Sequence, residues 1–154
     1  MTNNGDTTDN PFFAKLWTFL SNHETEEIQR LRTENLAGVS GRVLEVGAGT
    51  GTNFAYYPTT VTEVVAVEPE VRLAPQAQAA ARKAPVPVTV SAGTVERYLS
   101  AADGTPFDAV VCSLVLCSVC VPCPLCRRIW PTKLSRAKSL SLPAMQRWSV
   151  GVAW

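Results

Sequence analysis

The sequence predicts an α/β protein in which helices cover both faces of a parallel sheet of about four strands. Short β-branched runs alternate with helix-like segments between residues 42 and 112. Such alternation is typical of a parallel sheet, because a crossover helix must return the chain to the start of the next strand. With 154 residues, 46% of them hydrophobic, the chain is long enough to bury one substantial core.

The predicted elements follow one another in a regular order. Strands are expected at Arg42–Val46, Val61–Val67, Val86–Val90 and Phe107–Cys112. Helices are expected at Glu70–Ala84 and Glu96–Ala102, with a helical start at Asn53–Tyr57 that Pro58 interrupts. The residues after Val119 offer no alternating β-branched run. The doubly wound, Rossmann-like sheet is therefore expected to be incomplete.

The N-terminal part predicts two helices after a polar start. Residues 1–10 are polar and acidic, and we expect them to be disordered. One helix opens at Pro11 and carries a broad apolar face between Phe12 and Leu20. A second helix is expected from about Glu24 to Leu36. We expect the first helix to pack on the core, with a lid over a functional site as the alternative.

No targeting or membrane-spanning segment is evident in the sequence. The N-terminus lacks the basic and apolar regions of a signal peptide. No apolar run reaches the roughly 18–20 residues that cross a bilayer. We therefore expect a cytoplasmic protein without stable membrane insertion.

Composition divides the chain at about residue 119. All 13 acidic residues precede this point, whereas residues 120–154 hold basic residues, four prolines and three of the four tryptophans. We interpret 11–119 as a partial domain and 120–154 as an atypical, irregular tail. A shifted reading frame, a divergent end and a basic nucleic-acid-binding tail are the alternatives. Because the charges are spread out and match no known module, no nucleic-acid partner is expected.

A glycine-rich segment directly follows the first predicted strand, with glycines at 47, 49 and 51. Glycine permits positive φ angles and lets the backbone approach a ligand, although an ordinary βα turn is the alternative. Thr52 stands where a dinucleotide fingerprint has glycine, and no nearby lysine marks a P-loop. Glu45, two residues before the first glycine, suits the ammonium group of an amino-acid ligand better than a pyrophosphate.

A second acidic residue ends the next predicted strand. Glu68 lies 17 residues after Gly51. A carboxylate at this place in a doubly wound sheet can accept hydrogen bonds from both hydroxyls of a ribose. The alternative is an ordinary solvated acid at a strand end, and the spacing from the glycines favours the ribose.

Leu44–Gly51, Val67–Pro69 and Phe107–Cys112 resemble the successive motifs of class I S-adenosylmethionine-dependent methyltransferases. Thr52–Pro58 and Ser113–Val119 narrow the resemblance to the methyltransferase-like 7 group and its bacterial relatives, close to the ubiquinone-biosynthesis type. The similarity covers about residues 34–119. It implies S-adenosylmethionine as the cofactor.

The resemblance also implies which residues hold the methionine and ribose parts of the cofactor. Glu45 would bind the methionine part together with the backbone of Gly47, Ala48, Gly49, Thr50 and Gly51. Glu68, followed by Pro69, would bind the ribose.

Later segments are implied to complete the cofactor site. Val95 would meet the adenine through its backbone, and Ser113 and Leu114 would line the cavity near the sulfonium. Relatives often have Asp at the position of Thr94, where it accepts a hydrogen bond from the adenine amino group. In this chain the acceptor would be the uncharged threonine hydroxyl.

The implied reaction is methyl transfer to a small-molecule acceptor, and the resemblance suggests a thiol or lipophilic one. Since such a displacement depends largely on positioning, no catalytic residue is assigned. His23, the single histidine, is interpreted as a surface residue. The alternative function is a truncated, inactive fragment that retains part of the cofactor site.

All five cysteines lie between residues 112 and 126, four of them at intervals of three: Cys117, Cys120, Cys123 and Cys126. Thiolates at such intervals could converge on zinc or on an iron–sulfur cluster. Cys117 falls in the Ser113–Val119 segment, where the resembling family has a packed apolar position. Cys112 and Cys117 are therefore interpreted as core residues, and no metal site is expected.

Overall fold

A computed structural model of the chain describes residues 2–3, 7–112, 137–140 and 150–153, with side chains for 7–112. Its main feature is a six-stranded sheet in the order β5-β4-β3-β6-β8-β7. The strands are β3 (Gly41–Val46), β4 (Val61–Glu68), β5 (Val88–Ala92), β6 (Ala109–Cys112), β7 (Ala137–Leu140) and β8 (Val150–Ala153). Neighbours among β5, β4, β3 and β6 all run parallel, which confirms the predicted four-stranded parallel sheet.

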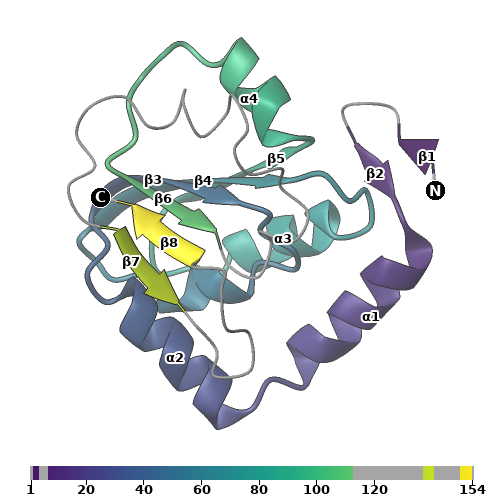
Figure 1. Ribbon diagram of the computed structural model, residues 1–154, viewed down its shortest axis with the longest axis horizontal. Helices are drawn as coiled ribbons and strands as arrows, with labels where there is room; N and C mark the ends of the chain where they lie inside the picture. The colour runs from purple at the N-terminus through teal and green to yellow at the C-terminus, as the bar shows by residue number, and fades with distance from the viewer. Residues whose placement is uncertain (1, 4–6, 113–136, 141–149, 154) are drawn as a thin grey trace.

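Helices cover this sheet from both sides. The helices of the described residues are α1 (Pro11–Asn22), α2 (Glu26–Leu36), α3 (Ala74–Ala81) and α4 (Val95–Ala101), with a short 3-10 helix η1 (Thr52–Tyr56). Of these, α2, α3 and α4 cover the sheet. Figure 1 shows α4 on one side of the sheet and α2 and α3 on the other. β5 begins two residues later than expected, because Pro87 has no N–H to contribute to the ladder that Val88 opens opposite Val64.

Alternating side chains of the central strands build two core layers. Val43 and Val64 pack with Leu36 of α2 and Ala77 of α3 on one face. On the other face the cluster is formed with α4 and consists of Leu44, Val46, Val65, Val67 and Val95. Both faces of β3 and β4 are thus apolar, as is typical of strands buried on both sides.

Two strands come from the tail, where the sequence predicted none. β7 and β8 pair antiparallel, and β8 pairs with β6 at Val110 and Ala153. The expectation of a strand-free tail beside an uncovered β6 is wrong for these two segments. Val150–Ala153 is composed of small and β-branched residues, which suit a sheet edge. The rest of the tail lies outside the described residues, so its origin stays untested.

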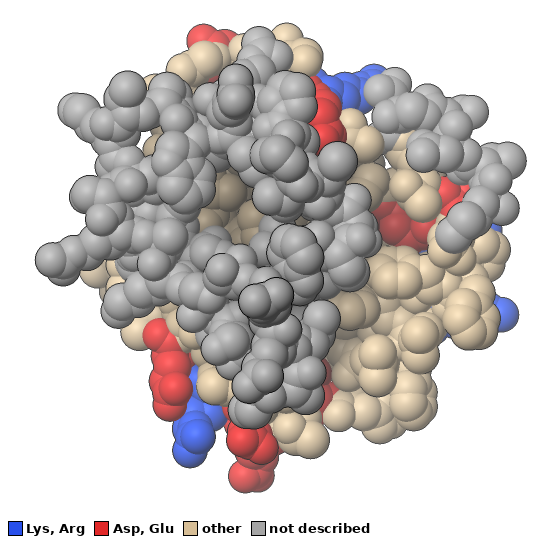
Figure 2. Space-filling view, in the orientation of Figure 1, with Lys and Arg blue, Asp and Glu red and all other residues tan. Residues whose placement is uncertain are grey.

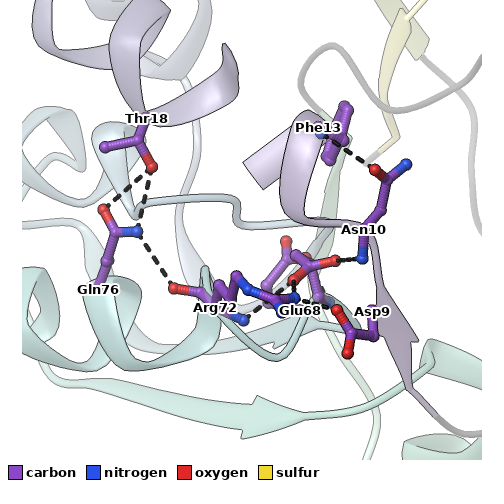
Figure 3. A network of polar contacts seen from close by, with 8 residues as sticks. Asp9, Asn10, Phe13, Thr18, Glu68, Arg72 and Gln76 are labelled. Carbon is purple, nitrogen blue, oxygen red and sulfur yellow. Dashed lines mark hydrogen bonds and ion pairs between the residues drawn. The ribbon is translucent and has the colours of Figure 1, made fainter. Parts of the chain in front are cut away.

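The N-terminus is held in place rather than disordered at residues 8–10. β1 (Thr2–Asn3) pairs with β2 (Thr8–Asp9). The Thr8 N–H donates to the Pro69 carbonyl at 2.7 Å, and the Asn10 N–H donates to the buried Glu70 carboxylate at 2.7 Å. The prediction of disorder is wrong here, because composition cannot reveal a buried partner 60 residues away. We call residues 8–10 the N-terminal strap (Figure 3).

Helix α1 follows the strap and does not pack on the core as expected. Ala14 is its one buried residue, and its large apolar side chains are between 42% and 79% exposed: Phe12, Phe13, Leu16, Phe19 and Leu20. The helices within the described ranges include none that is both long and apolar enough to cross a bilayer. Most of the apolar surface of α1 is therefore not buried in the core.

Candidate functional site

The carboxyl ends of three parallel strands are joined by backbone hydrogen bonds. After β3, the N–H groups of Gly47 and Ala48 donate to the Val67 carbonyl at 2.8 and 3.2 Å. After β5, the Gly93 N–H donates to the Glu68 carbonyl at 2.9 Å. These bonds bring the glycine loop (Gly47–Gly51), the end of β4 and the start of α4 to one edge of the sheet, where doubly wound folds bind ligands.

Glycine is required at two positions of the loop. Gly49 has φ +59° and Gly51 has φ +80°, a region that other residues rarely adopt. A Cβ on Gly49 would overlap the indole nitrogen of Trp17, and one on Gly51 would lie 2.6 Å from Cε2 of Phe54. Gly49 thus lies against α1 and Gly51 against η1, with no room for a side chain at either position.

Glu68 links the glycine loop to the segment after β4. Its side chain is buried, and its oxygens accept from the N–H of Gly49 at 2.6 Å and from the N–H of Glu70 at 2.9 Å. Burial raises the pKa of this carboxyl, against the opposing effect of the two N–H donors. Glu68 is therefore not the solvated strand-end acid that the sequence left as an alternative.

Glu45 lies in a buried polar network beneath the loop. Its carboxylate accepts from Nδ2 of Asn53 and from the Tyr57 hydroxyl, both at 2.8 Å. Nη1 of Arg32 donates to Oδ1 of Asn53 at 2.5 Å, and Nε of Arg32 donates to Glu24 at 2.9 Å. The network ties α2 to β3 and η1. Both oxygens of Glu45 are thus engaged within the protein.

Sequence reasoning missed the partners of Glu45. Asn53 and Tyr57 stood within the segment that resembles a family motif, but nothing marked them as neighbours of an acid on β3. Arg32 is one of several charged residues of α2, and only the packing of α2 against η1 distinguishes it: Arg32 is 8% exposed. A buried arginine requires a partner, so its burial is the observation that identifies the network.

Burial raises the pKa of Glu45 to about 7, although the Tyr57 and Asn53 hydrogen bonds and the Arg32 charge oppose this. The folded protein therefore holds a proton on Glu45 more tightly than the unfolded chain does. That contribution to stability is complete below about pH 4.5 and is lost as the pH rises through about 7.

We expect Glu45→Gln to remove this pH dependence. Urea unfolding at pH 5 and pH 8 should show a loss of stability in the wild type that exceeds the loss in the variant by on the order of 2 kcal/mol. Glu68, whose pKa is also raised by burial, is present in both proteins and serves as a constant background. An equal loss in both proteins would contradict the assignment to Glu45.

Three other predicted residues have structural partners of their own. The Thr94 hydroxyl caps α4 by accepting from the Arg97 N–H at 3.4 Å. Val95, the first residue of α4, is buried in the core. The Pro69 carbonyl accepts a hydrogen bond from the N–H of Thr8 in the strap. A bond from Thr94 to an adenine would therefore share an oxygen that already serves the helix.

Ser113 and Leu114 lie outside the described residues, as do the four cysteines from 117 to 126. The expectations that concern them stay predictions. Cys112 is partly buried beside the Leu44 cluster. His23 is exposed, which confirms it as a surface residue.

The charges visible on one face of the molecule are mixed. Figure 2 shows the described Lys and Arg side chains of this face interspersed with Asp and Glu rather than gathered into a patch. The side chains of the basic residues of the tail are outside the described part, so the expectation of no nucleic-acid partner stays untested.

A family model described as a methyltransferase domain matches residues 44–130, more than half of the chain. The match begins in β3 and includes the glycine loop, Glu68 and the start of α4. The chain belongs to the methyltransferase domain family. The predicted fold and the class of protein are thereby confirmed together, whereas the narrower resemblance to the methyltransferase-like 7 group stays a prediction.

Two human proteins are similar to this methyltransferase domain. Thiol S-methyltransferase TMT1A is 36% identical over 118 residues, which are 71% of this chain and 47% of the relative. Thiol S-methyltransferase TMT1B is 36% identical over 121 residues, 73% of this chain and 48% of the relative. The chain thus spans about half the length of the relatives that it matches.

Proposed function

We propose that this methyltransferase domain binds S-adenosylmethionine at the carboxyl edge of its sheet and methylates a small-molecule thiol. The observation that carries the proposal is the buried Glu68 carboxylate, which is hydrogen-bonded to Gly49 in the middle of the glycine loop. This contact fixes an acceptor for ribose hydroxyls against the backbone of Gly49, which carries no side chain that would exclude a ligand. Both human relatives are named thiol S-methyltransferases, which supports a thiol as the acceptor.

The residues of the edge fit such a cofactor. Each carboxylate oxygen of Glu68 accepts one N–H and keeps further acceptor capacity for a ribose hydroxyl. The glycine loop allows close approach, and the hydroxyl of Thr50 is buried without a hydrogen-bond partner among the described residues. Both features favour a polar ligand beside the loop.

Glu45 would support the amino-acid end of the cofactor from below. Its carboxyl favours an ammonium group near the loop once it is ionised, that is above its raised pKa of about 7, but its oxygens are already held by Asn53 and Tyr57. We therefore assign it two tasks, which are to hold η1 against β3 and to contribute charge. Gly47, Ala48 and Gly51 would contribute backbone, and Thr94 and Val95 would border the adenine.

The chemistry that the cofactor supplies is a methyl group on a sulfonium centre. The task of the protein is then to exclude water and to align the acceptor sulfur with that methyl group. The acceptor sulfur gains a bond to carbon, the sulfonium loses one, and the thiol proton leaves to solvent. Because the thiolate is the attacking form, turnover is expected to rise with pH until the acceptor thiol is ionised, which for a cysteine-like thiol occurs at about pH 8.5.

The test is a transfer assay with matched acceptors. The purified chain is incubated with S-adenosylmethionine and either an alkanethiol or the alcohol of equal length, and products are measured by mass spectrometry. We expect a methyl thioether and S-adenosylhomocysteine from the thiol, and at most traces from the alcohol. Equal product from both acceptors would exclude thiol specificity.

The alternative is a domain that retains the loop and Glu68 but transfers no methyl group. Binding without transfer separates the two. A chain that methylates no acceptor would support the alternative, whether or not it still binds S-adenosylhomocysteine, and a chain that binds no cofactor would exclude the proposed methyltransferase activity. A cytoplasmic location stays a prediction, made because no targeting or spanning segment is evident in the sequence.

A further inference from the structure

Two buried polar atoms beside the glycine loop have no hydrogen-bond partner among the residues that the structure describes. They are Nε1 of Trp17 and Oγ1 of Thr50, and they are the two such side-chain atoms in the described part of the chain. A buried donor without a partner costs about 1–3 kcal/mol. That both lie at one loop, rather than dispersed through the molecule, indicates a ligand that satisfies them.

Trp17 reaches the loop from α1. Its ring lies directly over Gly49, where an added Cβ would come within 3.2 Å of Cδ1 as well as overlapping the nitrogen. The ring of Phe13 stacks on it at 5.9 Å between centroids. The indole N–H is therefore placed at the one loop glycine whose own N–H donates to Glu68.

The N-terminal strap fixes this position of α1. Glu70, two residues after Glu68, accepts from Asn10 and from the Arg72 N–H, and Arg72 pairs with Asp9 (Figure 3). Further along α1, Thr18 and Gln76 of α3 are hydrogen-bonded. A hollow of about 330 Å³ lies under α1 between Lys15, Phe19 and Arg72. Trp17 is thus positioned by polar contacts around it rather than by a packed core.

The chemistry of the two atoms selects the ligand group. An indole N–H only donates, and a threonine hydroxyl can donate, so the atom that they meet must be an acceptor. Of the groups in the proposed cofactor, the ribose hydroxyls suit the Glu68 acceptor and the ammonium group suits the charge of Glu45. The carboxylate only accepts, and so do the adenine ring nitrogens, but the adenine is assigned to Thr94 and Val95, whereas the carboxylate belongs to the amino-acid end assigned to this loop.

We propose that Trp17 is a cofactor-binding residue, which donates its indole N–H, together with the Thr50 hydroxyl, to the carboxylate of the amino-acid end. This inference rests on the proposed function. It makes α1 a part of the site rather than a helix of the core, and it explains why a tryptophan lies over Gly49 of the loop.

The test compares two ligands that differ in that carboxylate. S-Adenosylhomocysteine carries the amino-acid end, and 5′-methylthioadenosine lacks it. We expect Trp17→Phe, which keeps a ring and removes the N–H, to weaken binding of S-adenosylhomocysteine about tenfold or more in calorimetric titration, since a hydrogen bond to a charged group is lost. Binding of methylthioadenosine should change less than twofold.

Two further measurements keep the result independent of folding defects. Phe12→Ala, on the same helix but 79% exposed, should leave both affinities unchanged. In the wild type, the ¹⁵N–¹H indole signal of Trp17, identified by its loss in Trp17→Phe, should shift with S-adenosylhomocysteine and not with methylthioadenosine. Thr50→Val should repeat the ligand-dependent loss of affinity.

Several outcomes would overturn the inference. An unchanged affinity in Trp17→Phe, or an equal loss for both ligands, would show that the indole N–H does not meet the carboxylate. Failure of the wild type to bind S-adenosylhomocysteine would instead remove the proposed function, and this inference with it. The two failures are therefore distinguishable in one series of titrations.

Discussion

Gly49→Asp is expected to abolish binding of S-adenosylhomocysteine, with a dissociation constant raised at least 100-fold. A side chain at this position would enter the space of the Trp17 ring and would force a residue other than glycine to φ +59°. A new carboxylate would also lie beside Glu68, whose oxygen is bonded to the N–H of the same residue. The like charges would repel each other in a buried setting.

A second glycine provides the matched control. Gly104 also has a positive φ, +81°, but a Cβ there would meet nothing within 4 Å. Gly104→Asp therefore carries the backbone strain, about 1–2 kcal/mol, without the collision, and it should leave binding intact. Calorimetric titration of both folded variants gives the comparison. Retained affinity in Gly49→Asp would show that the cofactor does not bind at this loop.

Arg32→Ala is expected to destabilise the fold by about 3–5 kcal/mol, a large part of the 5–15 kcal/mol that holds a typical domain together. Arg32 is 8% exposed and pairs with Glu24, whose side chain is 12% exposed. It also donates to Asn53, which in turn supports Glu45. Its removal leaves a largely buried carboxylate and an amide oxygen without their donor.

Helix α2, which carries Arg32, also carries an exposed arginine that controls for the loss of one positive charge. Arg30 pairs with Glu34 one turn away, and both side chains are more than 60% exposed. Arg30→Ala should change the free energy of unfolding by no more than about 0.5 kcal/mol. Urea unfolding of the two variants at pH 7 makes the comparison. Similar losses in both would mean that the buried network contributes no more than a surface pair.

The four parallel strands, the glycine loop and the acid at the end of β4 could be predicted from the sequence because each rests on local chemistry. Valine-rich runs between glycine and proline specify strands, and Gly49 and Gly51 specify a backbone that only glycine adopts readily. The spacing from Gly51 to Glu68 follows from the length of one βα unit. Local patterns of this kind depend on neighbouring residues only and can be identified without knowing the long-range contacts of the chain.

The partners of these residues were decided by tertiary structure alone. Arg32 looks like any helix-surface arginine in the sequence, and Trp17 looks like a core residue of an apolar helix. Only the folded chain places Arg32 beside Asn53, Trp17 on Gly49 and Asn10 on Glu70.

The tail strands and the strap show the same limit. β8 pairs with β6 across about 40 residues of sequence, and the strap pairs with the segment after β4 across about 60. Such pairings depend on loop closure and on which sheet edge or buried carboxylate lies within reach, and no local pattern encodes either. The sequence by itself therefore determined the parallel sheet and its loop, whereas the tertiary structure decided what covers that loop, because burial and long-range pairing arise only once the chain has closed.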